Sequence, residues 1–184
     1  MIVEFLQLET DRLNIRRFRD DDLEAYVAIR SSPEITAFEG EYTLERGRKL
    51  IESMKDKELG APGWFQFALE QKSSGELIGD MAFNFIELPQ TAEMGYSLAP
   101  PLWGKGIAFE ATAKILELAF TNLELHRVIA FTAQNNLRSQ RLLDRHQFRL
   151  EARSLESYRV NGIWIDEFQY ALLKREWRAK ITAV

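Results

Sequence analysis

Residues 100–111 decide the fold of this chain, and they read Pro100-Pro101-Leu102-Trp103-Gly104-Lys105-Gly106-Ile107-Ala108-Phe109-Glu110-Ala111. The prolines cannot donate to a sheet ladder, so they end the strand expected before them. The glycines carry no Cβ and let the backbone approach a ligand closely. The helix expected from Gly106 opens with unpaired N–H groups and the positive end of a dipole. This order of strand end, glycine loop and helix start predicts an anion site suited to a diphosphate.

The same residues exclude two other phosphate motifs. A P-loop has Ser or Thr after its lysine, whereas Gly106 follows Lys105 here. A dinucleotide-binding loop needs a third glycine where Phe109 stands. Lys105 either adds a positive charge to the site or lies in solvent. A plain connecting loop remains an alternative on these residues alone.

Strand and helix patterns alternate on both sides of this loop, which predicts a mixed α and β fold. Strands are expected over residues 13–18, 65–71, 76–85, 91–98, 127–133, 148–160 and 163–172. Helices are expected after residue 22, where Ser32-Pro33 ends the first one, and then over 43–57, 106–122, 135–146 and 174–184. Asn161-Gly162 favours a type I′ turn between the last two strands. In the strand at 91–98, Glu93, Gly95 and Ser97 share one face.

Composition narrows the class of protein. The chain has 184 residues, of which 46% are hydrophobic and 28% charged, so we expect one domain over residues 1–184. Its 24 basic and 28 acidic residues leave a formal charge of −4, which is unlike the basic footprint of a nucleic-acid binder. The absence of cysteine excludes disulfides, thiolate zinc sites and a cysteine nucleophile. No signal peptide and no run of roughly 20 apolar residues is present, so we expect a cytoplasmic protein without a membrane partner.

Further short motifs resemble a known family. They are Leu8-Glu9-Thr10-Asp11-Arg12-Leu13, Ala92-Glu93-Met94-Gly95-Tyr96, His126-Arg127, and an Asn-x-x-Ser element at Asn136 and Ser139. From about residue 8 to 173 the chain resembles the GNAT superfamily of N-acetyltransferases, and within it the RimJ/RimL-like group. Two positions depart from the general pattern: Trp103 replaces Gln or Arg, and Gln147 replaces the glycine before Phe148.

The resemblance implies a mixed, splayed and mostly antiparallel sheet of about seven strands flanked by helices, with acetyl-CoA between the fourth and fifth strands. It implies that the pantetheine pairs with backbone at Tyr96, Ser97 and Leu98. It implies that the diphosphate is held by backbone N–H groups of Trp103, Gly104, Lys105, Gly106, Ile107 and Ala108. Asn136 and Ser139 are implied to lie beside the pantetheine and its thiol end.

The implied reaction is direct transfer of acetyl from acetyl-CoA to a primary amine, which needs no metal. The amine must lose a proton, and Glu93 is the first candidate for the general base, acting through water. Glu93 is otherwise a solvent-facing or substrate-binding carboxylate. Ser139 is the candidate that protonates the departing sulfur, and its alternative role is a hydrogen bond to its own helix. Tyr158 is a further candidate in the substrate cleft.

The acceptor is expected to be a protein N-terminal amine, such as that of a ribosomal protein, or a small-molecule amine. Its pocket is expected from residues 30–63 and the closing hairpin. Four acidic residues could attract a cationic amine or could simply be solvated: Glu34, Glu39, Glu41 and Glu156. A homodimer is plausible by resemblance.

The two histidines and Ser97 bear on other possible classes of site. His126 and His146 have no further ligands at metal-binding spacing, so His126 is expected at a strand edge and His146 as a charge at a helix end. Ser97 in Gly95-Tyr96-Ser97-Leu98-Ala99 allows a serine hydrolase as an alternative. A coenzyme A-binding module without transfer activity is the other alternative.

Overall fold

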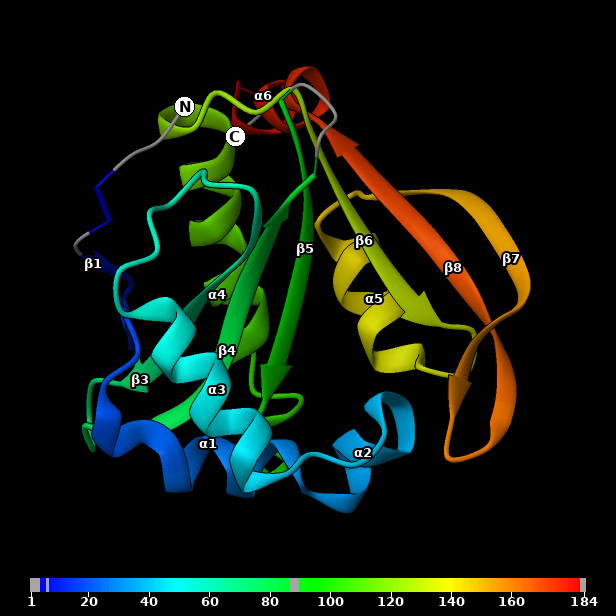
Figure 1. Ribbon diagram of the computed structural model, residues 1–184. Coiled ribbons are helices and arrows are strands. Elements are labelled where there is room, and N and C mark those ends of the chain that lie inside the picture. Colours follow the sequence, from blue (N-terminus) through cyan, green and yellow to red (C-terminus); the bar gives the residue numbers. More distant parts are fainter. Residues whose placement is uncertain (1–3, 6, 87–89, 183–184) are drawn as a thin grey trace.

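The computed structural model describes residues 4–5, 7–86 and 90–182. Within these residues one sheet runs in the order β1-β2-β3-β4-β5-β6-β8-β7 (Figure 1). Its strands are β1 (Gln7–Glu9), β2 (Leu13–Arg16), β3 (Gly63–Gln71), β4 (Leu77–Phe85), β5 (Thr91–Leu98), β6 (Arg127–Ala133), β7 (Arg149–Val160) and β8 (Ile163–Leu173). The expected mixed, mostly antiparallel sheet is confirmed. It has eight described strands rather than seven, because β1 is too short for a periodic pattern to reveal it.

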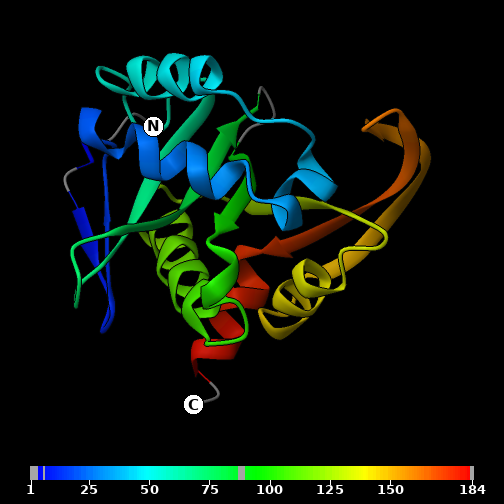
Figure 2. The same cartoon turned by 90° about the horizontal axis from the view of Figure 1, so that it is seen from below.

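Helices cover both faces of the sheet. They are α1 (Leu23–Arg30), α2 (Pro33–Glu39), α3 (Leu44–Met54), α4 (Ile107–Glu117), α5 (Leu137–Arg145) and α6 (Lys174–Thr182). Figure 2 shows α1 and α3 on one face and α4 and α5 on the other. A π-helical turn, Leu118–Asn122, extends α4 to the end expected for it. The expected last helix is present, and its residues 183 and 184 lie outside the described part of the chain.

The sequence interpretation missed α2. Ser32-Pro33 does end α1, but Pro33 is also the first residue of α2. Proline is well placed there, because the first residue of a helix has no intrahelical partner for an N–H group. Thr43 does cap α3, since its hydroxyl accepts a hydrogen bond from Arg46 N at 3.2 Å. That helix ends at Met54, three residues before the predicted end at 57.

The sheet opens between β5 and β6. These parallel strands pair only over Thr91–Glu93 and Arg127–Ile129, whereas β5 stays paired with β4 from Ala92 to Leu98. Gly79 of β4 permits a very close approach, because a Cβ there would lie 2.3 Å from the carbonyl oxygen of Ser97. The end of β5 therefore follows β4 and leaves β6, as Figure 1 shows. The peptide groups on the free edge of β5 beyond Glu93 lie outside the β5–β6 ladder.

The main hydrophobic core lies between the sheet and α4. Phe67 and Phe83 from the sheet and Ile115 from α4 are among its fully buried members. A smaller cluster around Tyr26 and Tyr42 lies under α1. Among the described helices none is both long and apolar enough to cross a membrane. The rigid core thus holds the end of β5 and the start of α4 beside the opening in the sheet.

Candidate active site

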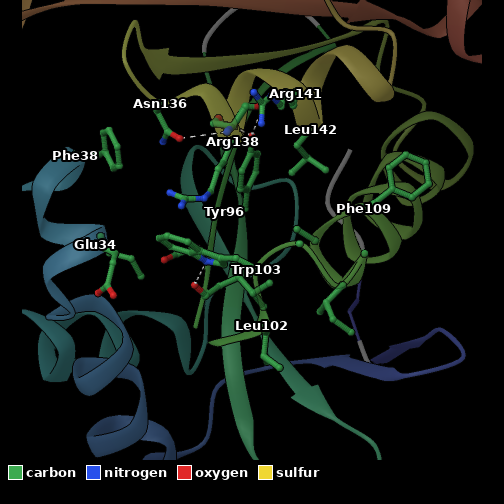
Figure 3. A pocket seen from close by; sticks show the side chains of 18 of the residues that line it. Glu34, Phe38, Tyr96, Leu102, Trp103, Phe109, Asn136, Arg138, Arg141 and Leu142 are labelled. Atoms are coloured by element: carbon green, nitrogen blue, oxygen red, sulfur yellow. Dashed lines mark hydrogen bonds between the residues drawn. The ribbon is translucent and has the colours of Figure 1, made fainter. Parts of the chain in front are cut away.

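A cavity of about 380 Å³ occupies the opening between β5 and α5. It is walled by α2, the end of β5, the glycine loop, the first turn of α4 and one face of α5 (Figure 3). Its lining includes most of the cofactor-binding residues predicted from the sequence, namely Tyr96, Ser97, Leu98, Trp103, Gly104, Gly106, Ile107, Ala108, Asn136 and Ser139. Lys105 is not part of this lining.

The glycine loop has the geometry of an anion site at a helix start. Gly104 and Gly106 have φ of 76° and 77°, in the left-handed region that favours glycine. Gly106 directly precedes α4, and its carbonyl accepts the first bond of the helix, from Glu110 N at 3.1 Å. The N–H groups of Ile107 and Ala108 therefore belong to the unpaired first turn.

Two of the six predicted N–H donors are already used within the loop. Trp103 N donates to Pro100 O at 3.1 Å and Lys105 N donates to Leu102 O at 3.4 Å. These two N–H groups therefore shape the turn, and their role at the diphosphate stays a prediction. The side chain of Trp103 lines the cavity. Its indole Nε1 donates a hydrogen bond to Leu98 O at 2.7 Å, which fixes the orientation of the ring.

Three arginines that the sequence analysis did not single out line the cavity from α5. Arg138, Arg141 and Arg145 are spaced three and four residues apart, so they share one face of the helix. The Arg138 guanidinium lies 4.7 Å above the Trp103 ring, and that of Arg145 lies 4.4 Å above Phe109. Their helical spacing was the signal that could have revealed them.

His146 packs against Phe109, one of the residues that line the cavity. Its ring stacks on Phe109 with centroids 4.2 Å apart, and the side chain is buried. His146 does lie at the helix end, as the C-cap of α5, but its side chain is buried there rather than exposed. His126 does lie at the strand edge, where its backbone bonds to Gln90 and Lys174. No group of three His, Asp or Glu in the described part of the chain is arranged to hold a metal ion.

Tyr96 and Ser139 form a hydroxyl pair in the cavity. Their oxygens lie 2.7 Å apart, and either can donate. Asn136 caps α5 by accepting from Ser139 N at 3.2 Å, which fixes the serine backbone. Burial raises the pKa of Tyr96 well above its usual range, and the bond from Ser139 offsets part of this. Tyr96 is thus a neutral hydroxyl at physiological pH. The sequence had assigned only its backbone to the site.

Glu93 lies on the opposite face of β5 from Tyr96 and is not part of the cavity lining. Burial raises its pKa, and a hydrogen bond from Asn84 Nδ2 at 3.2 Å opposes the rise. The pKa of Glu167 on β8 is also raised, by burial and by the charge of Glu93. The carboxyl groups of Glu93 and Glu167 therefore interact electrostatically where the sheet begins to open.

The α2 wall adds the carboxyl groups of Glu34 and Glu39 to the cavity. Glu39 pairs with Arg30, whose Nη1 lies 3.5 Å from Oδ1 of the buried Asp80. The closing hairpin touches this wall, because Asn161 Nδ2 donates to Thr36 O at 3.3 Å. Glu41, Glu156 and Tyr158 are exposed and lie outside the lining of this cavity.

Ser97 does not have the environment of a hydrolase nucleophile. It lies inside β5, opposite Asp80, and its Oγ is buried without a hydrogen-bond partner among the described residues. A nucleophile elbow needs a sharp turn at the serine followed directly by a helix. Here Leu98 continues the strand, so the serine hydrolase alternative is wrong.

A sheet opened beside a glycine loop and a helix start is the arrangement that the resemblance implied for an acetyl-CoA-dependent transferase. A family model described as "Acetyltransferase (GNAT) domain" matches residues 12–149. The chain belongs to the GNAT acetyltransferase family, within its RimJ/RimL-like group, and is an acetyl-CoA-dependent N-acetyltransferase.

Three similar proteins illustrate this. The uncharacterized N-acetyltransferase p20 of Bacillus licheniformis is 32% identical over 92% of this chain and 97% of its own length. A GNAT acetyltransferase structure from Bacillus anthracis is 28% identical, with a TM-score of 0.80 over 93% of this chain and 100% of that one. The [ribosomal protein uS5]-alanine N-acetyltransferase of Escherichia coli is 29% identical over 61% of this chain and 59% of its own.

Proposed function

We propose that this enzyme transfers the acetyl group of acetyl-CoA directly to a primary amine, either a protein N-terminal amine or a small-molecule amine. The observation that carries the proposal is the cavity at the opening of the sheet. It brings the glycine loop, the arginine face of α5 and the Tyr96–Ser139 pair to one place. These are an anion site, a set of cations and a proton-carrying pair, which suit a diphosphate donor and a departing thiolate.

The residues present fit coenzyme A. The free edge of β5 at Tyr96–Leu98 offers peptide groups that lie outside the β5–β6 ladder to the pantetheine. The diphosphate is assigned to the N–H groups of Gly104, Gly106, Ile107 and Ala108, which line the cavity. Arg138, Arg141 and Arg145 add positive charge from α5. The volume of about 380 Å³ lies within the range of small-molecule sites.

Acetyl-CoA supplies an activated thioester, and the chain supplies the proton transfers. An N-terminal amine titrates near pH 8 and a lysine near 10, so the attacking amine must lose a proton. We assign this proton to Glu93 through a water molecule, because burial raises its pKa and makes it a stronger base. The hydroxyl of Ser139 protonates the departing sulfur, and the proton that Ser139 loses returns from solvent through the neighbouring Tyr96 hydroxyl, so that both hydroxyls end neutral.

The acceptor is assigned to the space between α2 and the closing hairpin. Glu34 gives this side of the cavity negative charge, which suits an amine that arrives as a cation, whereas Glu39 is paired with Arg30. A relative is named for acetylation of an alanine in ribosomal protein uS5, which favours an N-terminal peptide among the candidates. Tyr158 lies exposed on β7 of the same hairpin.

Two measurements test the proposal. Calorimetry with the intact protein should detect binding of coenzyme A, and absence of binding would refute the assignment of the cavity. Consumption of acetyl-CoA should then be followed over N-terminal peptides beginning with alanine or serine, and over polyamines and other small amines. Binding without turnover on any of these would favour a coenzyme A-binding module instead.

A further inference from the structure

The turn between β1 and β2 is bonded to the glycine loop although nearly the whole first half of the chain separates them. Thr10 Oγ1 donates to Oε1 of Glu110 at 2.5 Å, and Arg12 N donates to the same oxygen at 2.9 Å. Arg12 Nε donates to Oε2 of Glu110 at 2.6 Å, and its Nη1 donates to Lys105 O at 3.0 Å. Arg12 therefore joins the first turn of α4 to the loop that precedes it. We call these four bonds the N-terminal clasp.

The clasp offsets an unfavourable charge. Glu110 lies in the first turn of α4, at the helix end assigned to the diphosphate. An ionised carboxylate there repels a second anion unless a cation neutralises it. Burial disfavours its ionisation, but the bonds from Thr10 and Arg12 outweigh burial and lower the pKa of Glu110. The carboxylate is thus ionised and paired with the guanidinium rather than facing the ligand alone.

The clasp also engages a carbonyl that would otherwise extend the helix. In a regular α-helix Phe109 N–H would bond to Lys105 O, four residues earlier. Here Arg12 takes that carbonyl, and Gly106 turns the chain with φ of 77°. The helix starts one residue later, with Glu110 N on Gly106 O. The first turn of α4 therefore begins after Gly106, and its N–H groups have no intrahelical partner.

We propose that Arg12 is a positioning residue that holds the glycine loop in its diphosphate-binding conformation, through Glu110 and the Lys105 carbonyl. This inference rests on the proposed function. Arg12 acts on the loop and not on the reacting atoms. Its loss should therefore lower the affinity for donors that carry the diphosphate and leave the affinity for donors without it unchanged. Two simpler roles make different predictions: a diffuse positive charge, and a contact that only stabilises the fold.

The experiment compares two donors, acetyl-CoA and S-acetylpantetheine, which lacks the diphosphate. For Arg12→Gln and Arg12→Lys we expect KM for acetyl-CoA and Kd for coenzyme A to rise about tenfold, as for loss of one charge-assisted hydrogen bond. The kcat at saturation and kcat/KM for S-acetylpantetheine should stay unchanged. Lysine keeps the charge but cannot bond the carboxylate and the carbonyl with one planar fork, so it should not rescue binding.

Two further variants sharpen the result. Glu110→Gln should also raise the Kd for coenzyme A. If the Glu110 carboxylate merely repelled the ligand, this variant would bind coenzyme A more tightly instead. Arg19→Gln is the matched control, because Arg19 is 56% exposed and pairs with Glu70 at 3.0 Å, while Arg12 is 47% exposed. This control should leave both donors unaffected.

The outcomes separate the explanations. Rescue by lysine, or tighter binding by Glu110→Gln, overturns the clasp in favour of simple charge. A parallel loss with both donors, together with a lowered Tm, shows a role in folding only and also overturns it. If the unaltered protein does not bind coenzyme A, the proposed function fails first and the clasp fails with it.

Discussion

The buried carboxyl group of Asp80 gives a pH dependence whose size can be worked from the structure. Asp80 lies on β4 and is 2% exposed. Burial raises its pKa from 3.8 to about 6, with Arg30 opposing the rise and Glu39 adding to it. The difference of about 2 pKa units corresponds to roughly 3 kcal/mol, at about 1.4 kcal/mol per unit. The substitution Asp80→Asn removes the titrating carboxyl group and keeps the shape of the side chain.

The sign follows from where the proton is held. The folded pKa exceeds the unfolded one, so between about pH 4 and pH 6 the native state keeps a proton that the unfolded chain releases. The contribution of Asp80 to stability therefore falls as pH rises through this window. Asparagine lacks this fall. The free energy of unfolding of Asp80→Asn minus that of the unaltered protein should rise by roughly 3 kcal/mol from about pH 4 to pH 7.

Urea unfolding at a series of pH values, followed by tryptophan fluorescence, measures this difference. Asp166→Asn is the control of opposite sign, because the backbone N–H of Glu156 and the side chain of Arg153 lower the pKa of Asp166. Its difference should fall as pH rises. A difference for Asp80→Asn that does not change with pH, or that follows the sign of the control, would refute the reasoning.

Three further predictions concern the site itself. Glu93→Gln should lower kcat by about 10²-fold or more and leave the affinity for coenzyme A unchanged. It should also abolish the fall of kcat that the unaltered enzyme shows as pH drops through the raised pKa of Glu93. Equal turnover of the two proteins across the pH range removes Glu93 from the mechanism. Ser139→Ala should lower kcat on the order of 10²-fold, and Tyr96→Phe should add little in that background because the hydroxyls act as one unit; additive losses would contradict this. Gly106→Ala should lower the affinity for coenzyme A in calorimetry and the free energy of unfolding by about 1–2 kcal/mol, because φ of 77° strains alanine. A steric clash is not the cause, since the added Cβ would lie 3.5 Å from its nearest neighbour, Nη2 of Arg12. Unchanged affinity would exclude this loop from the site.

The sequence predicted those features that are encoded locally. Strands β5 and β6 have the predicted bounds, and the glycine loop precedes a helix as expected. The cap of α5 is Asn136, one of the two asparagines, 135 and 136, that the sequence offers for it. In each case neighbouring residues carry the information: alternation of faces, a capping side chain, or glycine and proline at a turn. These elements could therefore be anticipated from local pattern, whereas the opened sheet around the loop was implied only by the family resemblance.

Contacts between distant residues could not be predicted in this way. The bond between Tyr96 and Ser139 joins a strand to a helix 43 residues later, and the clasp joins Arg12 to Glu110 across 98 residues. Neither pair is visible in local periodicity, because both depend on how the sheet opens and on which element packs beside it. The arginine face of α5 was different, since its spacing was visible and only the cavity in front of it was unknown.

The distribution of charge around the cavity argues for direct transfer under the proposed function. The chain is acidic overall, with a formal charge of −4, yet Arg138, Arg141 and Arg145 line the cavity from α5. Glu34 and Glu39 line it from α2, and Figure 3 shows Glu34 and Arg138 on different walls. An anionic donor is attracted to the first wall and a cationic amine to the second. The two reactants can thus be held together beside the free edge of β5. The chain has no cysteine, Ser97 is buried within its strand, and the Ser139 hydroxyl is assigned to protonation of the departing sulfur. Under the proposed function this site therefore favours attack of the amine on the donor itself over an acetylated enzyme intermediate.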